Sequence, residues 1–172
     1  MQLSARRQLI LVIAIALISV GGAYALFYVA RSSGGWGTTN HGTFVEPAVT
    51  AAELSWPLAL VDRRVWWLWT VASDCEARCR KAVKDLRALQ ILLNRDADRV
   101  RRGFSGSPGA PPPGWLDEYP AITAFDANTK RLAPGVYIVD PIGNLVLFYP
   151  FEVDPKLILE DLKHLLRVSQ IG

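Results

Sequence analysis

The sequence predicts an α/β domain preceded by one N-terminal transmembrane helix. The helix is predicted by an apolar run at residues 9–30 that contains no charged residue. The domain is predicted by a continuously apolar segment at residues 65–71, followed at once by a helical pattern that carries both cysteines. Of the 172 residues, 51% are hydrophobic and 20% are charged, a balance that argues against a disordered chain.

The apolar run Leu9–Ala30 is long enough to cross a lipid bilayer, which we predict as its partner. Its 22 residues form a helix of about 33 Å, and the hydrocarbon core of a bilayer is about 30 Å thick. A cleaved signal peptide is the alternative, because Ala23-Tyr24-Ala25 has the small-x-small pattern of a cleavage site. The uncleaved anchor is favoured, since the run exceeds the ~7–15 residues of a signal-peptide core and continues past that site.

The charge distribution predicts the orientation of the anchor. The chain has 19 Lys and Arg against 16 Asp and Glu; Arg6, Arg7 and Arg31 flank the apolar run, and the charges of residues 32–172 balance. The net charge of +3 therefore gives no support for nucleic acid as a partner. The positive-inside rule places the N-terminus in the cytoplasm and exports the domain, because no charge follows Arg31 until Glu46.

This composition divides the chain into three predicted parts. Residues 1–31 form the cytoplasmic tail and transmembrane anchor, residues 32–40 a flexible tether rich in Gly, Ser and Thr, and residues 41–172 the exported domain. Export places the two cysteines of the domain in a compartment that permits disulfides.

The first half of the domain predicts a buried strand and a helix. Val65–Val71 is apolar without interruption, which is typical of a central strand covered on both faces, and a short extended segment at residues 42–49 precedes it. Ser73 and Glu76 have the spacing of a capping box, which predicts a helix with Ser73 as its N-cap and an end at Asn94. One mostly apolar face of this helix consists of Cys75, Cys79, Val83, Leu86, Gln90 and Leu93.

The second half predicts a hairpin after a variable region. Residues 98–105 are a weak strand candidate, residues 106–114 an exposed loop rich in Pro and Gly, and residues 115–127 a short helix with an irregular stretch. Residues 135–140 and 144–149 predict two strands, and the Asp-Pro-Ile-Gly sequence that joins them is typical of a turn.

A last helix is predicted to open with Asp154 as N-cap and Pro155 at the first helical position. Its stripe facing the core consists of Leu157, Ile158, Asp161, Leu162, Leu165 and Leu166. A buried strand that runs into a cysteine-bearing helix, followed by a hairpin and a closing helix, is the thioredoxin-like arrangement. The predicted fold is therefore a thioredoxin-like α/β domain.

Cys75 and Cys79 are the main candidates for a functional site. On a helix, Cβ atoms four residues apart lie about 5–6 Å from each other, whereas a disulfide needs about 4 Å. A disulfide thus requires Cys75 to lie before the helix or at its frayed end. Two thiolates at helical spacing would instead share one metal ion, and soft thiolates favour Cu(I) or Zn. The alternatives without a functional role are two small core residues or an inert disulfide.

Pro134 is the second candidate, since thioredoxin-like proteins place a cis-proline directly before the strand that corresponds to Val136–Val139. The alternative is a proline that merely starts a strand. His41 is predicted to be a solvated loop residue, with a metal ligand as the alternative, and His164 a surface or boundary residue. With two distant histidines, no nucleophile–base pair and hence no hydrolase or transferase site is predicted. Thiol–disulfide exchange is the enzyme activity that stays open.

The exported part resembles the Sco (SenC) proteins, membrane-anchored thioredoxin-fold factors that help to build the copper centre of cytochrome c oxidase. The resemblance rests on the N-terminal anchor, the C-x3-C pair, the segment Tyr137–Gly143 and the closing helix, in which Asp161-Leu162 precede Leu165-Leu166. It covers most of residues 41–172. The chain is most similar to small single-anchor proteins of gammaproteobacteria, which are usually found among cytochrome oxidase assembly genes and share its ending DLKHLLRVSQIG.

One departure from the family concerns copper. Sco proteins bind copper through both cysteines and one histidine, eight residues before the Asp of the hairpin turn, and counting back from Asp140 gives Leu132. The resemblance therefore implies only Cys75 and Cys79 as metal ligands, which suits a weak Cu(I) site and not Cu(II). A dithiol that keeps a partner's copper-binding cysteines reduced, with Pro134 beside it, fits the sequence better than a full copper site.

The resemblance implies a membrane-anchored periplasmic accessory factor for cytochrome c oxidase assembly, acting in copper-centre maturation through a dithiol or a weak Cu(I) site. Its partner would be an oxidase subunit or the copper-delivery factors of the oxidase. Its location would be the bacterial inner membrane, with the N-terminus in the cytoplasm. Two alternatives stay open: a non-catalytic thioredoxin-like binding module for an oxidase subunit, and a general periplasmic thiol–disulfide oxidoreductase.

Overall fold

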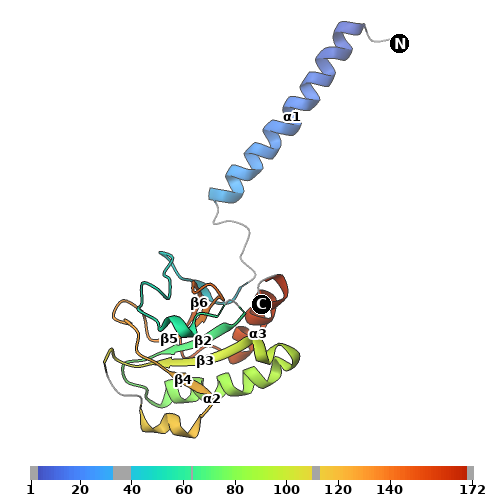
Figure 1. Ribbon diagram of the computed structural model, residues 1–172. Coiled ribbons are helices and arrows are strands. Elements are labelled where there is room, and N and C mark those ends of the chain that lie inside the picture. Colours follow the sequence, from blue (N-terminus) through green and yellow to red (C-terminus); the bar gives the residue numbers. More distant parts are fainter. Residues whose placement is uncertain (1–3, 33–39, 63, 110–112, 170–172) are drawn as a thin grey trace. The chain divides into compact units, whose positions relative to one another are not determined.

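The structure, a computed structural model, describes residues 4–32, 40–62, 64–109 and 113–169 (Figure 1). The chain divides into two compact units, Met1–Thr39 and Asn40–Gly172. The first unit contains one helix, and the second contains the sheet and both cysteines.

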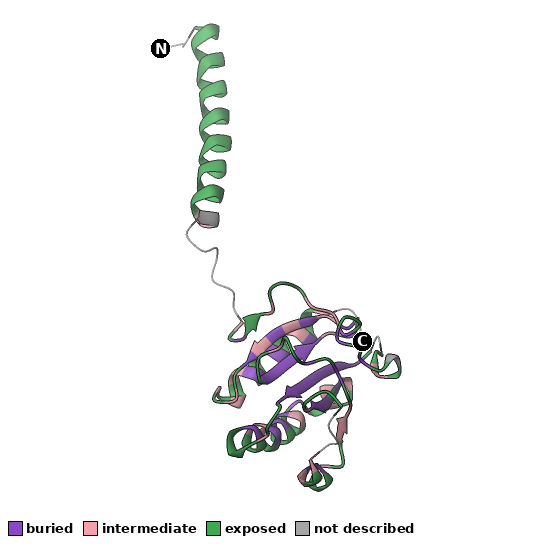
Figure 2. Cartoon of the chain, turned by 90° about the vertical axis from the view of Figure 1, so that its left-hand side faces the viewer, coloured by how far each residue is buried: buried purple, intermediate pink, exposed green. Residues whose placement is uncertain are grey.

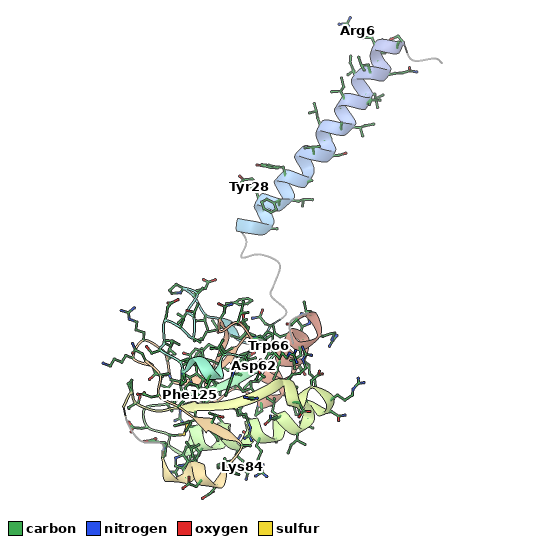
Figure 3. All side chains as sticks on the ribbon, in the orientation of Figure 1. Arg6, Tyr28, Asp62, Trp66, Lys84 and Phe125 are labelled. Atoms are coloured by element: carbon green, nitrogen blue, oxygen red, sulfur yellow. A yellow bond between two sulfur atoms is a disulfide. The ribbon has the colours of Figure 1, made fainter. Side chains whose placement is uncertain are left out.

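Helix α1 (Ala5–Ser32) contains the predicted anchor. Its apolar side chains are exposed along its length (Figure 2), and the stretch Ala5–Ala30 is long and apolar enough to cross a membrane. Figure 3 shows Arg6 near one end of the helix and Tyr28 near the other. The helix begins four residues before the predicted span Leu9–Ala30 and ends two residues after it. A lipid bilayer suits such a helix, since its backbone polar groups are paired internally and its side chains are apolar.

A six-stranded mixed sheet in the order β1-β6-β5-β2-β3-β4 forms the centre of the second unit. The strands are β1 (Thr43–Phe44), β2 (Trp66–Val71), β3 (Val100–Ser105), β4 (Ile122–Ala124), β5 (Gly135–Val139) and β6 (Leu145–Tyr149). β2 is parallel to β3 and β3 to β4, while the other neighbours are antiparallel. All six residues of β2 are buried, which confirms the predicted central strand.

Two helices, α2 (Ala77–Leu92) and α3 (Pro155–Val168), cover one face of the sheet (Figure 1). There Leu68 of β2 belongs to the same hydrophobic cluster as Leu86 of α2 and Leu162 of α3. Three short 3₁₀ helices complete the described part of this unit: η1 (Leu58–Leu60), η2 (Asn94–Arg99) and η3 (Gly114–Glu118). Helix α2 thus carries Cys79, and α3 carries the apolar stripe that packs against this face of the sheet.

The opposite face of the sheet is covered by irregular segments and is rich in aromatic residues. Trp67 and Trp69 point to this face because successive side chains of a strand alternate, and they pack with Trp56 and Tyr137. The indole rings of Trp56 and Trp69 meet edge to face with centroids 5.0 Å apart. The indole Nε1 of Trp69 donates to Ser105 Oγ at 3.0 Å, so the polar atom of this buried side chain is satisfied.

The hairpin and the closing helix form where the sequence predicts them. In the turn between β5 and β6, Asp140 Oδ1 accepts hydrogen bonds from the backbone N–H groups of Ile142 and Asn144, at 3.0 and 2.8 Å. Asp154 is the N-cap of α3 and accepts from Lys156 N at 3.0 Å. Both carboxylates satisfy backbone donors that a turn or a helix start leaves unpaired.

The capping-box prediction at Ser73 is wrong. α2 begins at Ala77, its N-cap is Glu76, and no side chain caps it. Strand-like pairing instead continues beyond β2, since Ala72 N donates to Ser105 O at 3.1 Å. A disulfide to Cys79 also requires Cys75 to lie off the helix, because Cβ atoms at helical spacing are too far apart for a disulfide.

The region between α2 and the hairpin contains one strand that the sequence pattern does not reveal. The weak strand candidate at residues 98–105 is confirmed as β3, and η3 is the short helix predicted after residue 115. The irregular stretch predicted next contains β4, which extends the sheet beside β3. A strand of three residues is too short to show the alternation by which strands are predicted.

Candidate functional site

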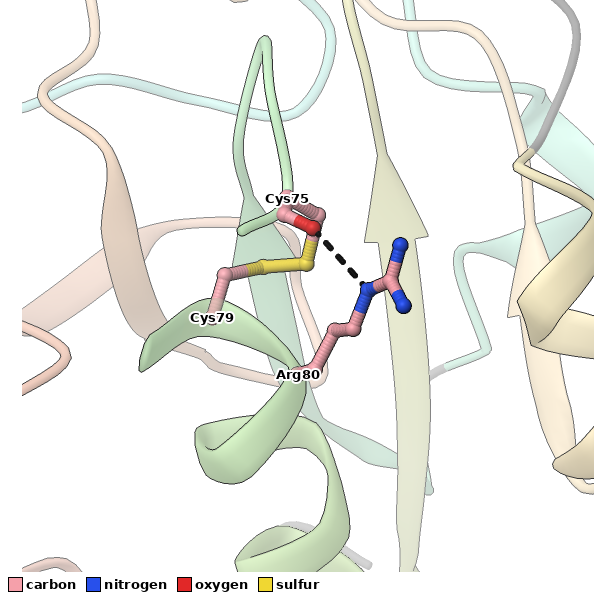
Figure 4. Close-up of a disulfide and its surroundings, with 3 residues drawn as sticks. All are labelled: Cys75, Cys79 and Arg80. Carbon is pink, nitrogen blue, oxygen red and sulfur yellow. Dashed lines mark hydrogen bonds between the residues drawn. A yellow bond between two sulfur atoms is a disulfide. The ribbon is translucent and has the colours of Figure 1, made fainter. Parts of the chain in front are cut away.

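Cys75 and Cys79 form a disulfide at the start of α2 (Figure 4). Cys75 lies two residues before the helix, and Cys79 lies in its first turn. Their Cα atoms are 5.1 Å apart, within the usual range for a disulfide. The pair therefore meets the condition that the four-residue spacing imposes, with Cys75 outside the helix.

The two cysteines differ in burial. Cys79 is 2% exposed and belongs to a hydrophobic cluster with Val83 and Phe104, whereas Cys75 is half-buried and packs at the margin of that cluster. Thiol–disulfide exchange requires direct attack on a sulfur, and Cys75 is the more exposed residue of the pair.

Arg80 and Trp115 lie beside the disulfide. Arg80 Nε donates to Cys75 O at 3.3 Å (Figure 4), and its guanidinium carbon lies 5.6 Å from the centroid of the Trp115 ring. Trp115 in turn meets Phe104 edge to face with centroids 5.7 Å apart. The segment before α2 is thus connected, through one arginine, to an aromatic side chain that comes 35 residues later.

Pro134 lies at the same end of the sheet as the disulfide but does not have the predicted geometry. It directly precedes β5, whose first residue, Gly135, pairs with Val71 at the end of β2. Among the described residues the cis peptide bond is Glu46–Pro47, so the bond before Pro134 is trans and the cis-proline interpretation is corrected. Pro134 is exposed, and its part in a functional site stays a prediction.

His41 is exposed and lies in a bend before β1, as predicted, but it also contacts a buried carboxylate. Its backbone N–H donates to Asp161 Oδ2 at 2.7 Å, and its ring Nδ1 lies 3.0 Å from Asp161 Oδ1. His164 is exposed on α3, as predicted. Neither histidine approaches the cysteines through any contact among the described residues, so the site brings together two sulfurs and no imidazole.

Asp161 is a buried carboxylate whose role the sequence pattern missed. Its side chain is 3% exposed, and besides His41 it accepts hydrogen bonds from Gly42 N at 2.9 Å and from the Tyr149 hydroxyl at 2.6 Å. Burial alone raises the pKa of Asp161, but the hydrogen bonds from Tyr149, Gly42 and His41 outweigh it, and the pKa lies below its ordinary value. Burial and the Asp161 carboxylate raise the pKa of Tyr149. The sequence does contain a signal for this role: Asp161 lies in the apolar stripe of the last helix, and a buried Asp needs hydrogen-bond partners.

The donor set beside the disulfide does not fit a three-ligand copper site. Leu132, eight residues before Asp140, packs against the cluster of Trp69 and Tyr137, whereas Cys79 belongs to the cluster of Phe104. Leu132 also lines a cavity of about 680 Å³ whose lining includes neither cysteine. Among the described residues, no three His, Cys, Asp or Glu side chains are grouped as metal ligands.

Reduction of the disulfide is expected to destabilise the domain only modestly. In the chain-entropy account, a bridge between Cys75 and Cys79 closes a five-residue loop and contributes about 2 kcal/mol, while the hydrophobic clusters persist without it. Urea unfolding of the full chain in detergent micelles, with and without reductant, measures this difference. The double variant Cys75→Ser/Cys79→Ser is the control and should not respond to reductant. Loss of cooperative unfolding on reduction would contradict this expectation.

Comparison with known proteins agrees with this fold. The family described as "Transmembrane-like, thioredoxin-like, C-terminal domain" matches residues 66–169. No curated protein matches the sequence. Three solved structures with this fold are at most 17% identical to the chain, so their likeness shows the fold alone.

Apo Sco1 from Thermus thermophilus is 17% identical, with 76% of this chain and 99% of that chain covered and a TM-score of 0.52. Yeast Sco1 with copper bound is 16% identical, with 77% and 96% covered and a TM-score of 0.54. A putative thioredoxin from Neisseria meningitidis is 10% identical, with 77% and 94% covered and a TM-score of 0.50.

Proposed function

The chain belongs to the family of transmembrane-like proteins with a thioredoxin-like C-terminal domain, and from this premise we propose that it is a membrane-anchored accessory factor for cytochrome c oxidase assembly. It acts by thiol–disulfide exchange through Cys75 and Cys79. One observation carries the proposal: the disulfide at the start of α2 joins a half-buried, reachable cysteine to a fully buried one. In a dithiol that attacks and then resolves, the attacking sulfur has to be accessible to the client, whereas the resolving sulfur needs to reach only the other cysteine.

The reaction begins with the reduced protein. The Cys75 thiolate attacks one sulfur of a client disulfide, so that a Cys75–client disulfide forms and the other client sulfur leaves as a thiolate. The Cys79 thiolate then attacks Cys75 Sγ, which forms the Cys75–Cys79 disulfide and releases the second client thiolate. Two electrons pass from the protein to the client, and solvent takes and supplies the protons. The structure shows the oxidised product, and a separate dithiol donor has to reduce it for the next cycle.

The client is a cysteine pair of an oxidase subunit or of a copper-delivery factor. Support comes from the sequence resemblance to Sco proteins and from the Sco1 structures among those with the same fold. The two-sulfur donor set, with Leu132 in place of a histidine, favours reduction of a client's copper-binding cysteines over transport of copper. Copper that reached the reduced pair would be held as Cu(I) by two thiolates.

We propose a single-pass topology with the N-terminus in the cytoplasm and the domain in the periplasm of a bacterial inner membrane. Support comes from α1, which is long and apolar enough to span a bilayer, and from Arg6 and Arg7 at its N-terminal end. The disulfide agrees with an oxidising compartment.

The proposal is tested with Cys75→Ser and Cys79→Ser in the full chain, expressed in cells that lack the wild-type protein. Both variants are expected to lose oxidase activity and the copper content of the oxidase, because either change removes the dithiol. Cys79→Ser should also accumulate a covalent Cys75–client adduct on a non-reducing gel, since the resolving thiol is gone. Mass spectrometry of the adduct identifies the client.

Ser73→Ala, which alters the same exposed segment without removing a sulfur, is the matched control and should leave the oxidase unchanged. Normal oxidase copper in both cysteine variants would overturn the proposal and favour the non-catalytic binding module. An adduct whose partner has no connection with the oxidase would favour a general oxidoreductase.

A further inference from the structure

Beyond the two cysteines, we infer that a groove between α2 and η3 binds an acidic, extended segment of the client that exchanges its disulfide with Cys75. This inference rests on the proposed thiol–disulfide function and names the chemistry by which the chain recognises its client. We call this surface the α2–η3 groove. It is formed by Arg80, Lys84, Arg87 and Ile91 of α2, by Trp115 of η3 and by Tyr119, the C-cap of η3.

The groove begins beside Cys75, where α2 and η3 lie next to each other (Figure 1). The Nε of Arg80 donates to the carbonyl oxygen of Cys75 at 3.3 Å. The guanidinium carbon of Arg80 lies over the ring of Trp115, 5.6 Å from its centroid, a distance typical of a cation–π contact. A peptide at this end of the groove therefore lies next to the chain segment that carries Cys75.

The groove then follows one face of α2. Residues 80, 84, 87 and 91 share this face because they are three or four positions apart. Lys84, Arg87 and Ile91 line a cavity of about 350 Å³ together with Tyr119. The ring of Tyr119 meets that of Trp115 edge to face, with centroids 6.1 Å apart. A peptide in the groove thus has basic side chains of α2 on one side and aromatic rings on the other.

The basic residues of α2 are not placed to stabilise the helix. Five of its residues are basic and one, Asp85, is acidic. Arg78 and Arg80 lie in its first turn, which contains no acidic residue, and its last turn contains no basic residue. The helix macrodipole favours the opposite arrangement. The positive charge of α2 therefore points to a role outside the helix.

Part of this charge is available to a ligand. Arg78 pairs with Glu152 at 2.7 Å, and Lys81 pairs with Asp85 at 2.6 Å. Within the described part of the chain, no carboxylate lies at salt-bridge distance from the three cations of the groove, Arg80, Lys84 and Arg87. Glu118 also lines the cavity and offsets one of these three charges. The groove thus has an excess of positive charge.

A buried arginine adds to this charge from the sheet. Arg102 of β3 is 4% exposed, and its Nε donates to Oε1 of Gln90 on α2 at 2.8 Å. Its Nη1 is buried and has no hydrogen-bond partner among the residues that the structure describes. Burial, and then the charge of Arg87, lower the pKa of Arg102. Because a buried cation without a counter-charge is costly, an anion that binds at Arg87 stabilises both arginines.

These features favour an acidic peptide segment as the occupant. Carboxylates complement Lys84 and Arg87, while Ile91, which is 70% exposed, offers an apolar contact at the end of the groove away from Cys75. Arg80 and Ile91 are eleven residues apart, which is about 16 Å along a helix. An extended peptide covers this distance with about five residues. The expected segment is therefore about five residues long, with acidic side chains followed by an apolar one.

The test uses the oxidised full chain in micelles of a non-ionic detergent. The probe is a rhodamine-labelled, cysteine-free peptide with three glutamates and one leucine, and fluorescence anisotropy measures its affinity. This peptide should bind about tenfold more tightly than the same peptide with glutamine in place of glutamate. Lys84→Gln/Arg87→Gln should remove most of this difference. About 1 M salt should do the same, because the Debye length falls to about 3 Å.

Lys163→Gln/Arg167→Gln is the matched control, because it removes two exposed cations from α3, outside the groove. It should bind the acidic peptide with wild-type affinity. Equal affinities for the two peptides would overturn the inference. So would an equal loss in both double variants, since that result would show a general attraction by basic residues. No thiol reacts in this measurement, so its outcome is independent of the proposed thiol–disulfide function.

The position of the groove beside Cys75 gives a second readout. The same two peptides are extended by one cysteine, which is held as a mixed disulfide with thionitrobenzoate. The Cys75 thiolate of the reduced full chain attacks the peptide sulfur, and thionitrobenzoate leaves and is measured by its absorbance. At low salt the acidic peptide should react about three- to tenfold faster than the glutamine peptide, and only the variant of the groove should lose this advantage. Equal rates for both peptides would overturn the inference that the groove brings a client to Cys75.

Discussion

Asp161→Ala is expected to lower the free energy of unfolding by about 3 kcal/mol. The side chain is 3% exposed and accepts hydrogen bonds from the backbone N–H groups of His41 and Gly42 and from the hydroxyl of Tyr149. Alanine leaves these donors without an acceptor in a place that water reaches poorly, and an unsatisfied buried donor costs more than the bond contributes. Chemical unfolding of the full chain in detergent micelles measures the loss.

The control for Asp161→Ala is its exposed neighbour Glu160, whose substitution by alanine should cost less than about 0.5 kcal/mol. The pH dependence gives a second test. Because the pKa of folded Asp161 lies below its ordinary value, the carboxylate stabilises the fold above the unfolded pKa of about 3.9. That contribution is lost as the pH falls through the lower, folded pKa. Asp161→Ala should lack this acid-labile part of the stability, and an unchanged pH profile would contradict the assignment.

Trp69→Ala is expected to cost about 4 kcal/mol, enough to unfold a large fraction of a marginally stable domain. The side chain is fully buried on the aromatic face of the sheet. Its ring lies 5.0 Å from that of Trp56 and 5.8 Å from that of Tyr137, measured between centroids. Truncation removes these contacts, leaves a large void and deprives Ser105 of its indole donor.

Trp69→Phe separates the two contributions to this loss. A phenyl ring keeps most of the aromatic packing and loses only the hydrogen bond to Ser105 and part of the volume, so its cost should be about 1–2 kcal/mol. Far-UV circular dichroism during urea unfolding measures both variants. If Trp69→Ala unfolded within about 1 kcal/mol of wild type, the aromatic cluster would not be the core element that its burial indicates.

The strongly patterned elements of the fold could be predicted from the sequence. The unbroken apolar segment of β2, the turn sequence after Asp140 and the Asp-Pro start of α3 each carry a local physical signal, and the structure confirms all three. The start of α2 was misplaced, because the capping pattern at Ser73 competes with a disulfide that needs Cys75 outside the helix. Local propensity does not indicate whether the capping pattern or the disulfide determines where the helix begins.

The candidate site was predictable only in part. The two cysteines stand out by number and spacing, but their difference in burial could not be predicted from the sequence. The side chains around them come from elsewhere in the chain. Trp115 reaches Arg80 across 35 residues, and His41 meets Asp161 across 120. Contacts of this range depend on how the sheet closes, which no local pattern in a single sequence specifies.

The contact between residues 41–42 and Asp161 also constrains the order in which the domain becomes complete. It joins the first described residues of the domain to its last helix, so almost the whole domain must be synthesised before the bonds can form. The short strand β1 lacks its partner until β6 emerges, and Gly42 lacks its carboxylate until α3 follows. During translation the anchor therefore leaves the ribosome early. Residues 41–42 can form their hydrogen bonds to Asp161 only near the end of translation.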